Sequence, residues 1–207
     1  MIHDVPSGPL RVCVFGGARP GRPEDRRLAA AVGTLLGARG HELIYGAGGV
    51  GVMGAVAWAA ADADVPVTGV IPEFLRLRER HQLAPTQQTV VTRDLLDRKR
   101  VMLERADAFL VLPGGIGTLD EILEVISMQA LDVTGKPLVL LRADGLWDRL
   151  VQLLDDLALR GYADALAGAS LLFADTAEEA VAMVERSARS ADAALVGVPF
   201  AEEVLEA

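Results

Sequence analysis

The segment of the chain best suited to chemistry is a glycine-rich run at residues 113–121. It reads Pro-Gly-Gly-Ile-Gly-Thr-Leu-Asp-Glu and directly follows the apolar stretch Ala108–Leu112. Its glycines let successive backbone amides turn toward one point, a helix starting near Gly117 adds its positive N-terminal end, and Thr118 adds a hydroxyl. This combination favours a phosphate-binding loop over the alternative, a tight turn that binds nothing. No Gly-Lys-Ser/Thr follows, which excludes the P-loop of an NTPase.

Two carboxylates, Asp120 and Glu121, follow in the first turn of the same predicted helix. The helix dipole alone favours acids there. However, a carboxylate so close to a phosphate repels it, unless the carboxylate faces a part of the ligand that becomes positive during a reaction.

A second glycine-rich run places Gly46, Gly48 and Gly51 at the G-x-G-x-x-G spacing of a dinucleotide-binding loop. The run follows the second predicted strand rather than the first. No acidic residue ends a following strand about 20 residues on, because Glu73 lies past Pro72. An NAD-dependent oxidoreductase is therefore the third-ranked hypothesis.

Around these motifs, short β-branched runs alternate with longer patterns of helical spacing. We expect strands at Arg11–Phe15, His41–Tyr45, Val65–Ile71, Thr89–Thr92, Ala108–Leu112, Pro137–Leu141 and Ser170–Phe173. We expect helices at Glu24–Arg39, after Gly54 to about Ala63, at Leu95–Glu104, from near Gly117 to about Leu131, at Trp147–Leu159 and at Ala177–Ser187. The segment Glu73–Gln88 is expected to be irregular.

This alternation predicts an α/β fold, a Rossmann-like three-layer sandwich with a central parallel sheet flanked by helices. Three glycine-rich turns follow the first, second and fifth strands, at the carboxyl edge where such sheets bind ligands. We expect residues 1–10 to form a leader, 11–187 a single nucleotide-binding domain and 188–207 a C-terminal tail.

Composition narrows the partners. The 207 residues carry a net charge of −9, which disfavours a nucleic acid polymer or a membrane as partner but still permits one small anionic ligand. Cys13 is the only cysteine and is expected to be buried, and the three histidines show no metal-ligand spacing. No apolar run approaches the roughly 20 residues of a membrane span, and no signal peptide is evident. We expect a cytoplasmic protein.

The pattern Pro-Gly-Gly-x-Gly-Thr-x-x-Glu resembles that of the Lonely Guy family, cytokinin riboside 5′-monophosphate phosphoribohydrolases often mislabelled lysine decarboxylases. The resemblance spans about residues 11–175. It is supported by the residues at 14–21, 45–54 and 69–72, by Arg98-Lys99 with Met102, and by Lys136-Pro137.

The resemblance implies a catalytic pair, Arg98 and Glu121, acting on a small-molecule nucleotide. It also implies substrate contacts from Glu79, Lys99, Gly114, Gly115, Ile116, Gly117, Thr118 and Ser127, the last in place of threonine. No metal or organic cofactor is implied. The resemblance also implies a homodimer or larger homo-oligomer, with helices near the active site at the interface between subunits.

The residues independently suit this chemistry. Breaking a bond between ribose and base builds positive charge on C1′ and the ring oxygen, and Glu121 can stabilise that charge or orient water. Arg98 can hold the phosphate or fix Glu121 by a charge-assisted pair. A lysine decarboxylase would instead need a lysine that forms a Schiff base with pyridoxal phosphate. Only Lys99 and Lys136 are present, and neither has the expected surroundings.

Several positions depart from the family pattern, which leaves the base open among cytokinin-type, other purine and pyrimidine nucleotides. The departures are Ala18 and Arg19 for paired serines, Leu95-Leu96 for Met-His, Asp97 for glutamate, Ser127-Met128-Gln129-Ala130 for Thr-Trp-x-Gln, and Thr134 for histidine. The main rival to an enzyme is a carrier that holds a phosphorylated ligand, such as molybdenum cofactor, without turnover.

Overall fold

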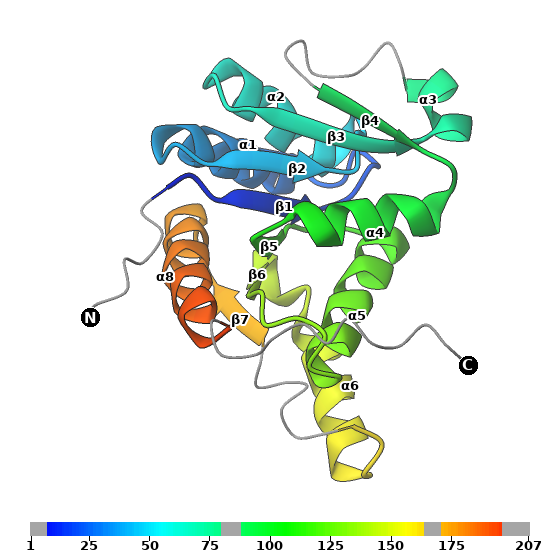
Figure 1. The fold of residues 1–207 in the computed structure, drawn as a ribbon, viewed down its shortest axis with the longest axis vertical. Helices are drawn as coiled ribbons and strands as arrows, with labels where there is room; N and C mark the ends of the chain where they lie inside the picture. Colours follow the sequence, from blue (N-terminus) through cyan, green and yellow to red (C-terminus); the bar gives the residue numbers. More distant parts are fainter. Residues whose placement is uncertain (1–7, 80–87, 164–170, 196–207) are drawn as a thin grey trace.

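A seven-stranded parallel sheet organises the chain (Figure 1). The computed structural model describes residues 8–79, 88–163 and 171–195. Within them the strands lie in the order β4-β3-β2-β1-β5-β6-β7, and every neighbouring pair is parallel. The strands are β1 (Arg11–Phe15), β2 (Glu42–Tyr45), β3 (Val67–Pro72), β4 (Gln88–Thr92), β5 (Ala108–Val111), β6 (Leu138–Leu141) and β7 (Leu171–Ala174). The predicted α/β fold is confirmed.

Helices connect successive strands and cover both faces of the sheet (Figure 1). They are α1 (Pro23–Ala38), α2 (Gly51–Asp62), α3 (Glu73–Glu79), α4 (Leu95–Arg105), α5 (Ile116–Ala130), the 3₁₀ turn η1 (Ala143–Gly145), α6 (Asp148–Leu159) and α8 (Ala177–Leu195). No helix among the described residues is both long and apolar enough to cross a membrane.

The core lies in two layers because successive side chains of a strand point to opposite faces. Val12 and Val14 of β1 pack in the layer beneath α1, α2 and α8. Cys13 and Phe15 point the other way, toward the helices α4, α5 and α6. Cys13 is fully buried as predicted, and this burial raises the pKa of its thiol well above the ordinary value.

The chain reverses its direction of sheet growth between β1 and β5. The first strands add on one side of β1, whereas β5 pairs with its other side. The turns that follow β1 and β5 meet there, and the Gly17 amide donates to the Pro113 carbonyl oxygen at 3.0 Å. Open parallel sheets bind their ligands at such a switch point.

The segment after β3 is where the sequence-based expectation was wrong. Residues 73–79 form α3 rather than an irregular stretch, and Gln88 belongs to β4. Glu73 pairs with Arg76 one turn later at 2.9 Å, so the charges that suggested a loop instead stabilise a helical turn. Residues 80–87 lie outside the described part of the chain.

Two helix ends also differ from expectation. The second helix begins at Gly51, inside the glycine-rich run, because the buried side chains of Val52 and Met53 outweigh the low helix propensity of glycine. The last helix continues to Leu195, so residues 188–195 of the predicted tail are helical.

Candidate active site

A cleft of about 550 Å³ opens at the carboxyl edge of the sheet, over β1 and β5. The turn after β1, the first turns of α5, and single side chains from α2 and α4 line it. The lining residues are Gly16, Gly17, Ala18, Arg19, Met53, Arg98, Gly115, Ile116, Gly117, Thr118 and Glu121. Of the three glycine-rich turns predicted to converge, those after the first and fifth strands line this cleft, whereas the run after the second strand reaches it only through Met53 of α2.

The N-terminus of α5 forms one wall. Gly115 is the residue before the helix, and its carbonyl oxygen accepts the first intrahelical bond, from the Leu119 amide at 3.0 Å. The backbone amides that precede Leu119 in the first turn have no carbonyl one turn earlier in the helix to bond to. They lie along the cleft with the buried Thr118, whereas Gly114 does not line it and packs against the Thr118 side chain.

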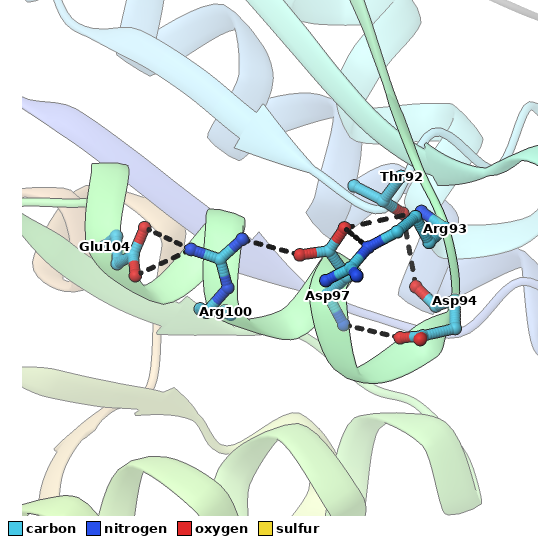
Figure 2. Close-up of polar contacts among 6 residues, drawn as sticks. All are labelled: Thr92, Arg93, Asp94, Asp97, Arg100 and Glu104. Carbon is cyan, nitrogen blue, oxygen red and sulfur yellow. Dashed lines mark hydrogen bonds and ion pairs between the residues drawn. The ribbon is translucent and has the colours of Figure 1, made fainter.

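Helix α4 carries Arg98, and a network of charges fixes the start of that helix (Figure 2). Asp94 caps it by accepting the Asp97 amide at 2.8 Å. The Asp97 carboxylate in turn accepts from Arg100 at 2.6 Å and from Arg93 at 3.4 Å. These bonds, with that to Arg100 the strongest, lower the pKa of Asp97 to about 2. The first turn of α4 therefore keeps its position near neutral pH.

The Arg98 side chain is anchored to the edge of the sheet. Its Nε donates to the carbonyl oxygen of Val70 in β3, and its Nη2 donates to that of Gly46 after β2, both at 3.1 Å. Gly46 is required at this place, because a Cβ there would overlap the guanidinium of Arg98. The glycine-rich turn after β2 thus holds an arginine rather than a dinucleotide.

Glu121 meets Arg98 in the cleft. Its Oε1 lies 3.9 Å from Arg98 Nη2, and the two side chains are only 12% and 14% exposed. Burial raises the pKa of Glu121 to about 7, although the charge of Arg98 opposes this shift. A carboxyl group with such a pKa is about half ionised at neutral pH, which suits proton transfer and the stabilisation of a developing positive charge.

Some predicted substrate contacts, Lys99 and Ser127 with Gly114, do not line the cleft, and Glu79 cannot be compared with it. Lys99 joins α4 to α5 through Asp120 at 3.1 Å and Glu124 at 3.0 Å, and it does not line the cleft. Ser127 is exposed further along α5, also away from the cleft. Glu79 ends α3, and its side chain lies outside the described part of the structure. Their roles stay predictions.

Sequence reasoning missed the five cleft residues at positions 16–19 and 53, of which Met53 and Arg19 bring large side chains. Met53 lines the cleft, and its sulfur accepts the Gly48 amide at 3.2 Å. The glycine-rich segments that contain or precede both residues were recognisable, but no pattern indicated these individual side chains.

Comparison with known proteins places the chain. A family model described as "Possible lysine decarboxylase" matches residues 53–184. The chain is 40% identical over 174 residues to the cytokinin riboside 5′-monophosphate phosphoribohydrolase of Mycobacterium marinum, covering 84% of this chain and 92% of that relative. It is 37% identical over 183 residues to LOG3 of Arabidopsis thaliana, named as the same enzyme, covering 86% and 83%. The chain belongs to the Lonely Guy family.

The Lonely Guy fold extends to more distant proteins. The molybdenum cofactor carrier protein of Chlamydomonas reinhardtii superposes with a TM-score of 0.66 at 20% identity, covering 86% of this chain and 97% of that one. At this identity the likeness concerns the fold alone.

The decarboxylase description of the matching family model does not fit the lysines of this chain. The Nζ atom of Lys136 donates to the carbonyl oxygens of Leu103 and Glu104, at 2.8 and 3.2 Å. Lys99 is held by the two carboxylates of α5. Neither amine lines the cleft; both border the groove between α4 and α5, where each is already engaged by carboxylates or carbonyl oxygens.

Proposed function

We propose that the chain hydrolyses the N-glycosidic bond of a nucleoside 5′-monophosphate, giving a free base and ribose 5-phosphate. The observation that carries the proposal is the largely shielded Arg98–Glu121 pair, which lines the same cleft as the amides at the start of α5. One ligand with a phosphate at one end and a developing positive charge at C1′ satisfies both features. The names of the M. marinum and Arabidopsis relatives describe this reaction on a cytokinin riboside 5′-monophosphate.

Phosphate binding positions the sugar. The amides of the first turn of α5 and the Thr118 hydroxyl are donors for the 5′-phosphate, assisted by the positive end of the helix dipole. The phosphate is remote from the bond that breaks, so its binding energy can orient the ribose over Glu121.

Glu121 acts on the breaking bond. As the base leaves C1′ with the bonding electron pair, positive charge spreads over C1′ and the ring oxygen, and the Glu121 carboxylate stabilises it. Water then bonds to C1′ through its oxygen, and one of its protons passes to the carboxylate. Glu121 gives up that proton again as the departing base gains one, so the net reaction moves one proton from water to the base. No metal or organic cofactor is needed for these steps.

Arg98 positions and ionises Glu121. Because its two hydrogen bonds to carbonyl oxygens hold the guanidinium in place, its charge favours the ionised form of Glu121 against the effect of burial.

We propose purine nucleotides, including cytokinin types, as the substrate class.

We also propose that the chain forms a homodimer or larger homo-oligomer. Leu96 on α4 and Leu123 on α5 are exposed, at 72% and 44%. Between these helices runs a groove of about 720 Å³ whose walls include Leu103, Met128 and Val133. Sedimentation velocity should give a dimer or larger species, and Leu96→Glu should shift it toward monomer.

A substrate panel tests the function. The purified protein would be incubated with nucleoside 5′-monophosphates, modified bases included, while free base and ribose 5-phosphate are separated by chromatography. We expect release of both products in equal amounts, and the ranking of substrates would identify the base. Binding of nucleotides without release of either product would contradict the enzyme and favour a carrier.

A further inference from the structure

Arg19 is a charged cleft residue to which neither the proposed reaction nor the family pattern gives a role. It lies in the turn between β1 and α1 and lines the same cleft as the first turn of α5. The family pattern has serine at this place, so the guanidinium is a feature of this chain.

The backbone of Arg19 is fixed at the cleft edge. Gly51, at the start of α2, has a φ of +68°, and a Cβ at Gly51 would collide with the Arg19 carbonyl oxygen. On the same turn, the Gly17 carbonyl accepts the Met53 amide at 3.0 Å. The turn is thus packed against the start of α2, which holds the root of the Arg19 side chain beside the cleft.

The guanidinium of Arg19 is available to a ligand. Its neighbours are committed, since Arg22 pairs with Asp25 at 2.9 Å and with Asp144 at 2.8 Å, while Arg26 donates to the carbonyl oxygens of Pro20 and Gly21. Arg19 has no hydrogen bond or ion pair with any residue in the described ranges and is exposed. A ligand can therefore bind the N–H donors of Arg19 without breaking a contact within the described part of the protein.

The charges around the cleft make this guanidinium significant. The charged side chains that line the cleft are Arg19, Arg98 and Glu121. Arg98 and Glu121 lie 3.9 Å apart and offset each other. Arg19 is therefore the cleft cation that has no carboxylate beside it among the described residues, in a protein whose overall charge of −9 repels anions.

We propose that Arg19 binds the 5′-phosphate of the nucleotide, opposite the amides of α5, and so adds a charge-assisted contact to the phosphate site. The proposal rests on the nucleotide as ligand, as inferred above. A guanidinium presents paired N–H donors that match two phosphate oxygens, which lysine or serine cannot reproduce. The consequence is selection for phosphorylated ligands at the binding step.

Calorimetric titration with AMP and with ribose 5-phosphate tests this role, because the two ligands share the phosphate and ribose but not the base. We expect Arg19→Gln to weaken both by a similar factor, about 10- to 100-fold, as for loss of a charged hydrogen-bond pair. Arg19→Lys should recover part of the lost affinity, since lysine restores the positive charge but not the paired N–H donors. Arg160→Gln, an exposed change directly after α6 that alters the net charge equally, should bind as the wild type does.

Unchanged AMP binding in Arg19→Gln would overturn the proposal, as would a lysine variant no better than the glutamine variant. Absence of binding of both ligands to the wild-type protein would also overturn it. Failure of the proposed enzyme looks different: the wild-type protein would bind AMP through Arg19 but release no base.

Discussion

The guanidinium of Arg98 lies 3.9 Å from the Glu121 carboxylate and is fixed there by the carbonyl oxygens of Gly46 and Val70. Four separate segments of the chain therefore converge on one ion pair: α4, α5, the end of β2 and the strand β3. The pair is close enough for strong electrostatic coupling but longer than a hydrogen bond, which leaves Glu121 free to turn toward a ligand.

Gly46→Ala should inactivate the protein without unfolding it. The new methyl group would overlap the end of the Arg98 side chain, which can swing away, so the fold survives while Glu121 loses its partner. We expect a fall in kcat comparable to that of Arg98→Ala, and little further loss in the double variant because both changes remove one interaction. Full activity in Gly46→Ala, with an unaltered circular dichroism spectrum, would show that the anchored arginine is dispensable.

The rate should depend on the ionisation of Glu121. Its pKa of about 7 means that the active carboxylate accumulates as the pH rises through neutrality, so kcat/KM should rise between about pH 6 and pH 8 and then level off. The substrate phosphate also titrates near pH 6, and its own curve, measured by ³¹P NMR on the free nucleotide, serves as the correction. A corrected profile that is flat across this range would argue against a carboxylate with a raised pKa.

The ionisation of Glu121 should also make the stability of the fold decrease as the pH rises. Because the folded-state pKa of Glu121 lies above the ordinary value of 4.5, the folded protein holds a proton that the unfolded chain has lost, and stability falls as the pH rises from about 4.5 to 7. Glu121→Gln removes this cost. In urea unfolding, the free energy of unfolding of the variant relative to that of the wild type should rise by on the order of 2 kcal/mol between pH 5 and pH 8.

A control for that measurement is Glu178→Gln, which removes an exposed carboxylate from α8. Equal behaviour of the two variants relative to wild type at both pH values would mean that the burial of Glu121 carries no energetic cost.

The inner strands were predictable because each is a short, largely apolar run, as a parallel sheet buried on both faces requires. The edge strand β4 is mostly exposed, and its β-branched valines and threonines indicated it instead. Helix α3 was not, because its seven residues carry paired charges and show no apolar periodicity. The start of α2 was hidden by glycines, whose low helix propensity is offset only by packing.

The site was predictable in part. The glycine-rich run at 113–118 and the acids after it indicated a phosphate beside a carboxylate, and the family resemblance supplied Arg98 as partner. What the sequence did not reveal depends on how distant segments meet. The anchoring of Arg98 on Gly46 and Val70 is one such feature, and the engagement of Lys99 by Asp120 and Glu124 is another.

The most direct test of the central claim is the rate of ribose 5-phosphate release by Glu121→Gln, measured beside its affinity for the same nucleotide. The substitution keeps the size of the side chain and removes its charge. We predict a fall in kcat of about 100- to 1,000-fold, as for loss of one group that stabilises transition-state charge, with affinity within a few-fold of wild type. Release at the wild-type rate would contradict the assignment of Glu121 as the group that acts on the glycosidic bond.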